Sequence, residues 1–231
     1  MLLALVLAAA CAAPRPPLQA APPHELGAAE LSRRDALFRQ AWEPVRGDVL
    51  VGVYLRPPAP PSWTARYRLR RSIDPLREVI AIDPSWWQSW WALGKVHERL
   101  DEAGEAEQCF ASALATAPAD VRAEVARDAG RTAAQAGDVP ATIHFYESAA
   151  RADPDDAGIT ANLAIAHLRA GHVGTAGNLV RDGLRRFPDD PGLRRVLGRV
   201  EDAERKSGPC PLPGGACAAA NRPAPGPPVV E

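Results

Sequence analysis

The sequence lacks an excess of charge of either sign and lacks a long apolar run. It contains 27 lysine and arginine residues against 28 aspartate and glutamate residues, a formal net charge of −1. This balance favours neither a nucleic acid nor an anionic membrane surface as the partner of the whole chain. The apolar run at residues 2–10 is too short to cross a bilayer as a helix. Any membrane association therefore depends on a lipid anchor.

The short motifs of common enzymes are also missing. The sequence contains no phosphate-binding P-loop, no dinucleotide glycine fingerprint, no nucleophile elbow and no HExxH zinc motif. Of its five histidines, His97 and His167 recur at the same place of an internal repeat described below, where packing is the simplest role. His167 and His172 are five residues apart, so they do not share one face of a helix. We therefore predict no enzymatic activity, no cofactor and no metal.

Cysteine is scarce, with four residues in the chain. Cys109 falls within a helical pattern and is expected to be a small buried hydrophobic residue. Cys210 and Cys217 enclose the Pro/Gly-rich stretch CPLPGGAC, which suits either a disulfide of an exported protein or two unpaired thiols. Their spacing matches no common zinc site, and no histidine lies near them. A metal- or redox-dependent role of these tail cysteines is the less favoured alternative function.

The N-terminus resembles a bacterial lipoprotein signal. Ala9, Ala10 and Cys11 fit the pattern in which small residues precede a cysteine that becomes lipid-modified. Leu7 lies one place further from the cysteine than is usual, and no lysine or arginine precedes the apolar run. The alternatives are an ordinary cleaved signal peptide and a cytoplasmic chain with a misassigned start. We predict a signal at 1–11, a lipidated Cys11, and a Pro/Ala-rich tether at 12–30 in the cell envelope.

An internal period organises the middle of the chain. Prolines recur at positions 84, 118, 154 and 188, with spacings of 34, 36 and 34 residues. Each proline follows a helical stretch that it cannot continue, and a neighbouring aspartate can cap the next helix. Small and large apolar residues recur in the same register. The small columns are Gly94, Gly130, Ala164 and Gly198; Ala106, Thr142 and Ala176; and Ala113, Ala149 and Gly183, while Phe110, Tyr146 and Val180 form a large column.

Each unit therefore consists of two expected helices joined by a short turn. Two helices of about 12–15 residues cannot bury their apolar stripes alone, but they can when they fold against each other and against the next pair. The units resemble the tetratricopeptide repeat, a helix–turn–helix unit of about 34 residues. The resemblance implies an all-α fold, a right-handed α-solenoid in which each unit contacts mainly its neighbours.

The resemblance covers residues 68–205. Full repeats are expected at 85–118, 119–154 and 155–188, with the two extra residues of the second repeat placed where its first helix begins. Residues 191–205 resemble the capping helix of such an array, and residues 68–82 resemble the second helix of a degenerate leading unit. Because Pro75 lies inside that stretch, its helix is expected to begin only at 74–75. Residues 206–231 are expected to form a disordered Pro/Gly-rich tail.

Residues 31–67 fit no repeat. The stretch LSRRDALFRQAWEPV has helical periodicity and is expected to end as a helix before Pro44. The stretch DVLVGVYL at 48–55 has the β-branched content of a short strand. Two roles stay open for it, packing across the first helices or docking to another protein through its edge.

Four tryptophans lie in the sequence PSWWQSWWALG at 84–94. The repeat register places Trp90 at the aromatic position that packs the two helices together, so we expect it in the core. Trp91 falls one place round the helix, where it either lines the concave groove or packs on the N-terminal segment. Trp86 and Trp87 lie at the helix entry, where they either pack on the 68–82 helix or stand partly exposed.

The same register predicts a concave groove lined by the first helix of each unit. This face is net basic with an apolar section in the third unit, so it suits a protein or peptide segment with carboxylates and one or two apolar anchors. The predicted binding residues are Trp91, Lys95, Arg99, Arg127, Arg131, Ile165, Arg169, Arg195 and Arg199.

Some tetratricopeptide repeat proteins clamp the C-terminal carboxylates of chaperones with lysine and asparagine residues. Here Trp91, Asp128 and Gly158 lie near the places where those residues would be needed, so this specific activity is not supported. We predict a non-catalytic interaction scaffold that is exported and tethered to a membrane. A cytoplasmic adaptor with the same fold is the alternative.

Overall fold

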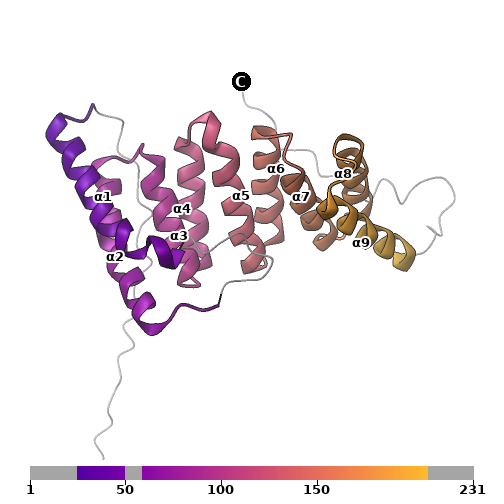
Figure 1. The fold of residues 1–231 in the computed structure, drawn as a ribbon, viewed down its shortest axis with the longest axis horizontal. Helices are drawn as coiled ribbons and strands as arrows, with labels where there is room; N and C mark the ends of the chain where they lie inside the picture. The colour runs from indigo at the N-terminus through magenta and orange to yellow at the C-terminus, as the bar shows by residue number, and fades with distance from the viewer. Residues whose placement is uncertain (1–24, 50–58, 208–231) are drawn as a thin grey trace, which may run out of the picture.

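The computed structural model describes residues 25–49 and 59–207, which form helices and no strand (Figure 1). The predicted signal, the tail, Cys11, Cys210 and Cys217 lie outside these described residues. The all-α prediction is confirmed for the described part. Its helices are α1 (Ala28–Val49), α2 (Trp63–Ile82), α3 (Trp87–Arg99), α4 (Ala103–Thr116), α5 (Ala119–Ala136), α6 (Val139–Ala152), α7 (Ala157–Arg169), α8 (Val173–Arg186) and α9 (Pro191–Ser207).

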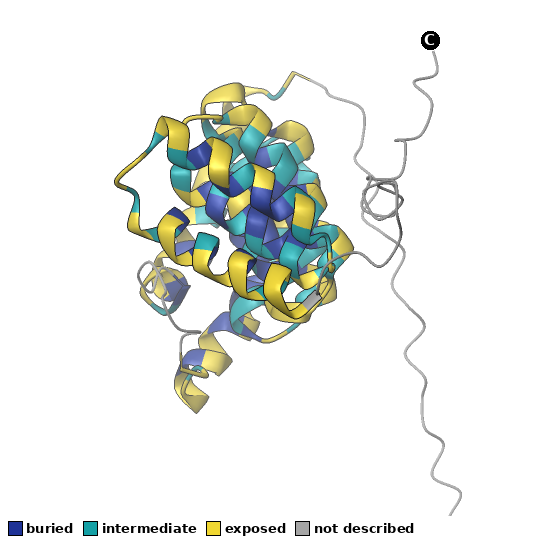
Figure 2. Cartoon of the chain, turned by 90° about the vertical axis from the view of Figure 1, so that its right-hand side faces the viewer, coloured by how far each residue is buried: buried dark blue, intermediate teal, exposed yellow. Residues whose placement is uncertain are grey.

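The helices stack in tandem, in chain order, from α1 at one end of the molecule to α9 at the other (Figure 1). Each helix contacts the next one along the chain, and further contacts join α1 to α3 and α7 to α9. Viewed from the α9 end, buried residues lie where helices face each other and exposed residues cover the outside (Figure 2). The predicted α-solenoid is confirmed, because each pair buries its apolar stripe against its neighbours.

The small residues of the repeat lie where the two helices of a pair approach most closely. A Cβ atom added at Gly94 would lie 3.0 Å from the Phe110 ring, and one added at Gly130 would lie 3.1 Å from the Tyr146 ring. In the third unit the corresponding residues are Ala164 and Val180, which are buried in one cluster. Where the first helix carries a Cβ atom, at Ala164, the second helix thus carries valine in place of the aromatic ring of the other two units.

Short polar side chains and glycines set the helix ends. The Asp156 carboxylate accepts hydrogen bonds from the backbone N–H groups of Gly158 and Ile159, at 2.7 and 3.0 Å. Asp138 caps α6 in the same way. Gly137 and Gly171 have φ values of 80° and 79°, a left-handed conformation that reverses the chain between the helices of a pair. α5 begins directly after Pro118, so the extra length of the second unit lies at its start.

Two prolines lie inside helices, and the prediction that they limit those helices is wrong. α1 continues through Pro44 to Val49, and α2 begins at Trp63 rather than at 74–75 and continues through Pro75. The first residues of the predicted strand at 48–55 are therefore helical, and the others lie outside the described residues. Apolar residues after each proline are buried, and their burial outweighs the proline penalty of about 3 kcal/mol. They are Val45, Val49, Leu76, Val79 and Ile80.

The segment that fitted no repeat thus supplies most of α1 and the first residues of α2, and these two helices form a leading pair. α1 packs along α2 and also contacts α3. Ala41, Trp42, Val45 and Val49 of α1 join the core cluster that contains Trp90 and Leu93 of α3. Within the described residues the stack therefore begins with α1, and residues 68–82 lie in α2, the second helix of this leading pair.

Overpacking the close approach in the second unit is expected to destabilise the stack. Gly130→Val places a branched side chain against the Tyr146 ring and is expected to cost about 2 kcal/mol of unfolding free energy. Gly198 occupies the same column on α9, but nothing lies within 4 Å of a Cβ atom added there. Gly198→Val is therefore the matched control, and urea unfolding followed by circular dichroism compares the two variants. Equal losses of stability in the two variants would contradict this explanation, because contact with the Tyr146 ring would then not account for the cost at Gly130.

Candidate functional site

The residues predicted to bind a partner lie on α3, α5, α7 and α9, the first helices of the pairs. We call the side of the stack that the first helices line the inner face. Contacts of α1 with α3 and of α7 with α9 show that these helices are neighbours across consecutive pairs. Helices that approach each other across units line the shorter side of a curved stack. On this face α3 carries Trp91, Lys95 and Arg99, α5 carries Arg127 and Arg131, α7 carries Ile165 and Arg169, and α9 carries Arg195 and Arg199.

Four charged side chains form an ion network between α3 and α5. Lys95 Nζ lies 2.8 Å from Glu98 Oε2 and 3.9 Å from Asp128 Oδ1. Arg131 lies 2.9 Å from Asp128 Oδ1 and 3.3 Å from Glu98 Oε1. Two cations and two carboxylates cancel, so this part of the inner face carries no net charge. The prediction that Lys95 and Arg131 contribute to a basic groove is corrected here, because their charges are matched within the protein.

Burial makes the stability of the fold sensitive to the loss of any member of this network. The side chains of Lys95 and Glu98 are only 7% and 10% exposed. Burial alone would raise the pKa of Glu98, but the charges of Lys95 and Arg131 outweigh it and hold that pKa below its ordinary value. Burial would lower the pKa of Arg131, but Asp128 and Glu98 outweigh it and raise that pKa. Removing one member leaves its partners uncompensated, which costs about 3–5 kcal/mol for buried pairs.

Trp91 joins this network to the N-terminal helix. Its indole N–H donates a hydrogen bond of 2.8 Å to Asp128 Oδ2. Its ring lies against Trp42 of α1, with 5.6 Å between the ring centroids. Of the two roles left open for Trp91, packing on the N-terminal segment is the one that the structure shows, and the indole edge adds a bond across to α5.

The other inner-face residues have different surroundings. Arg99 donates to the backbone carbonyls of Asp48 and Ala59, so it holds the chain on either side of the segment at 50–58. Ile165 is partly buried against the core cluster of α7 to α9. Four arginines are exposed, and we call them the C-terminal basic strip. They are Arg127, which lies 3.3 Å from Asp156, Arg169, which donates to the carbonyl of Ala134, and Arg195 and Arg199.

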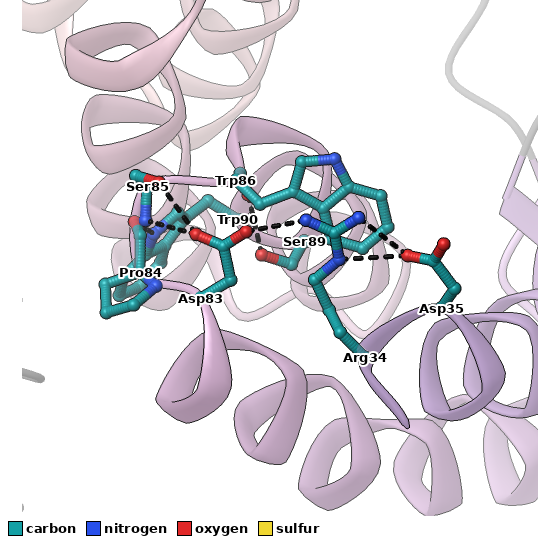
Figure 3. Close-up of polar contacts among 8 residues, drawn as sticks. All are labelled: Arg34, Asp35, Asp83, Pro84, Ser85, Trp86, Ser89 and Trp90. Carbon is teal, nitrogen blue, oxygen red and sulfur yellow. Dashed lines mark hydrogen bonds and ion pairs between the residues drawn. The ribbon is translucent and has the colours of Figure 1, made fainter. Parts of the chain in front are cut away.

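The turn between α2 and α3 places the other tryptophans (Figure 3). Trp90 is buried in the core as predicted, and its indole N–H donates to the carbonyl of Pro84 at 2.8 Å. The Arg34 guanidinium of α1 lies 4.2 Å from the centre of the Trp86 ring and 2.7 Å from Asp83. Trp86 thus packs on α1, and both Trp86 and Trp87 are partly exposed. The tryptophan-rich stretch is therefore a junction between the leading pair and the first repeat.

Reactive side chains are few in the described part of the chain. Cys109 is buried, and burial raises the pKa of its thiol to about 12, so it is the inert small residue that the sequence predicts. His97 Nδ1 pairs with Glu102 at 2.7 Å. His167 and His172 lie together at the turn after α7, a proximity that counting along one helix did not predict. Burial and the neighbouring His172 lower the pKa of His167.

The comparisons with known proteins agree with this architecture. The tetratricopeptide repeat family model matches residues 133–204. The fold is similar to that of PilF from Pseudomonas aeruginosa, at 18% identity and a TM-score of 0.50, over 77% of this chain and 72% of that one. Residues 133–204 thus match tetratricopeptide repeats in sequence, and the described residues share the fold of tetratricopeptide repeat proteins.

Two other solved structures share the fold. MamA of AMB-1 is 17% identical and MamA of MSR-1 is 16% identical, each with a TM-score of 0.50. The matches cover 84% of this chain and 98% of the first, and 75% of this chain and 86% of the second. No curated protein gives a significant match. At these identities the likeness shows the fold alone.

The tetratricopeptide repeat fold is a protein–protein interaction scaffold. Within residues 25–49 and 59–207, no cluster of three or more histidine, cysteine, aspartate or glutamate side chains is arranged to hold a metal ion. None of the helices in these ranges combines the length and apolarity that crossing a bilayer requires. The inner face is thus the candidate site, with its N-terminal half closed by internal pairs and its C-terminal half carrying exposed arginines.

Acid is expected to weaken the tetratricopeptide array through Glu98. Because its folded-state pKa lies below the ordinary value of 4.5, the unfolded chain takes up the proton first as the pH falls. The stabilisation is present above that value and is lost as the pH falls through the folded-state pKa. Glu98→Gln is expected to lower the unfolding free energy at pH 7 by about 3 kcal/mol and to flatten its decline below pH 4.5.

Urea unfolding at a series of pH values measures both effects. Glu124→Gln, at an exposed position of α5, is the control and is expected to follow the unmodified chain. A Glu98→Gln variant with an unchanged acid slope would contradict the assigned role of the network.

Proposed function

We propose that this chain is a non-catalytic scaffold of the cell envelope, held at a membrane by a lipid on Cys11, that binds an acidic protein segment along its inner face. One observation supports the binding part most directly. Lys95 and Arg131 are paired internally, whereas Arg195 and Arg199 are exposed on α9 and have no ion pair among the described residues. The available positive charge of this face thus lies toward the C-terminal end of the stack.

The chemistry of the C-terminal basic strip fits carboxylates. Arginine presents several donors in a rigid fork that binds a carboxylate through two parallel hydrogen bonds. Arg127 faces Asp156 at 3.3 Å, but its side chain is 44% exposed, so this pair is weak and open to exchange with a partner carboxylate. Ile165 and Leu168 of α7 are only partly buried and offer apolar contacts between the arginines. An extended or helical segment with acidic residues and one or two apolar anchors matches this arrangement.

Charge reversal on α9 tests the binding surface. The Arg195→Glu, Arg199→Glu double variant replaces two attractive contacts by repulsive ones and is expected to reduce partner recovery at least about tenfold. Crosslinking followed by pull-down from membranes, with the recovered protein quantified by mass spectrometry, measures the change. The matched control is Arg151→Glu, Arg185→Glu, which makes the same charge change at exposed positions on the second helices α6 and α8.

The control is expected to recover the partner as well as the unmodified chain does. If both double variants recover it equally, the inner face is not the binding surface. If both lose it equally, the attraction depends on net charge and not on this face, which also rejects the proposal.

The N-terminal part of the proposal predicts the mass of the mature protein. The small residues before Cys11 support cleavage at that cysteine and attachment of a diacylglyceryl group. Intact-mass measurement of the membrane-extracted protein is expected to show a chain that begins at lipidated Cys11. A chain clipped without lipid would reject the anchor and keep export, and a chain that begins at Met1 would reject both in favour of a cytoplasmic adaptor.

A further inference from the structure

Two histidines face each other at the turn that joins α7 to α8. The Nδ1 atoms of His167 and His172 are 3.3 Å apart, and their ring centroids are 5.6 Å apart. His167 is buried, whereas His172 is partly exposed. The pair therefore lies at the boundary between the interior and the solvent, where a small solute can reach it.

The backbone of the turn holds the two rings in this position. α7 ends at Arg169, and Gly171 takes a left-handed conformation with a φ of 79°. The backbone N–H of His172 then donates to the carbonyl of His167 at 2.8 Å. His172 precedes α8, but its side chain makes no capping hydrogen bond there. The rings are thus brought together by main-chain geometry, and neither is engaged in capping.

The same two repeat positions carry other chemistry in the other units. In the first unit they are His97 and Glu102, a base and an acid, with 2.7 Å between His97 Nδ1 and Glu102 Oε2. In the second unit they are Ala133 and Asp138, and the aspartate caps α6. In all three units the backbone N–H at the second position donates to the carbonyl at the first, so the turn brings these two positions together as a property of the fold. In the third unit both are imidazoles, whose facing nitrogens repel unless a proton or a cation lies between them.

We propose that His167 and His172 chelate a divalent transition-metal ion through their Nδ1 atoms. Zinc–nitrogen bonds of about 2.0–2.1 Å at a tetrahedral angle place two ligand nitrogens about 3.3–3.4 Å apart. The observed separation of 3.3 Å matches that spacing before any ion is bound. Imidazole is a common ligand of zinc, copper and nickel, and the carbonyl end of α7 favours a nearby cation.

The site has two protein ligands, and water completes the coordination. No larger cluster of metal-binding side chains lies in the part of the chain that the structure describes. An exchangeable site with open positions follows, rather than a closed structural centre. The expectation of no metal came from sequence spacing, which did not show that the turn brings positions 167 and 172 together.

Titration of the full chain with Zn²⁺ by isothermal calorimetry tests the site. The unmodified chain is expected to bind one Zn²⁺, and His172→Gln is expected to weaken this binding at least about tenfold. His172 is the residue to replace, because it is partly exposed and its loss leaves the core intact, which circular dichroism checks. His144→Gln, at an exposed position on α6, is the control and is expected to bind as the unmodified chain does. Titration with Co²⁺ adds a visible absorption band that reports tetrahedral nitrogen ligands.

Three outcomes would overturn the proposal. They are the absence of stoichiometric Zn²⁺ binding, equal binding by His172→Gln and the unmodified chain, and binding that is lost only when Cys210 and Cys217 are both replaced by serine. The last outcome assigns the metal to the tail cysteines. The result does not depend on the inner-face proposal, since neither Arg195 nor Arg199 takes part in this pair.

Discussion

The close approach of the two helices within each pair is the constraint on which the rest of this structure depends. At Gly94 and Gly130 there is no space for a Cβ atom without moving an aromatic ring of the second helix. Such close contact lets short helices bury their apolar stripes without a common central core. The stack grows by repeating this contact, so its stability is a sum of units and of the interfaces between neighbours.

The charged side chains of the inner face fall into a buried, paired group and an exposed group. Repetition places similar positions of α3 and α5 side by side, and there the chain uses two cations and two carboxylates to join the helices. A buried network of this kind is sensitive to the loss of any member, so it is poorly suited to exchange with a partner. The exposed arginines on α5, α7 and α9 have no such restriction. Residue type does not separate the paired from the exposed cations, since α5 carries Arg131 in the network and Arg127 among the exposed arginines.

Much of the fold follows from the sequence because a 34-residue period with matched small and large columns has few physical explanations. Trp90 was predicted correctly as core for this reason. The course of α1 and α2 through Pro44 and Pro75 was not, because local proline rules cannot weigh the burial of apolar residues against distant helices. Tertiary packing determines where both helices begin and end.

The site was less predictable, since the register shows which face a residue occupies but not which charge it meets. Glu98 and Arg131 are 33 positions apart in sequence and form an ion pair. A signal was present, because Lys95 with Glu98 and Asp128 with Arg131 are both opposite charges spaced for one helix face. The proximity of His167 and His172 depends on a turn, and helical periodicity says nothing about that.

Native-state hydrogen exchange of a chain shortened to end at residue 190 tests the central claim most directly. If each pair is stabilised mainly by its neighbours, removal of α9 takes away Leu193, exposes Ala176 and Val180, which pack against it, and speeds exchange in α7 and α8. Exchange in α1 to α3 is expected to stay close to that of the full chain. A uniform increase along all remaining helices would contradict the account, since it would show that the stack behaves as one cooperative core.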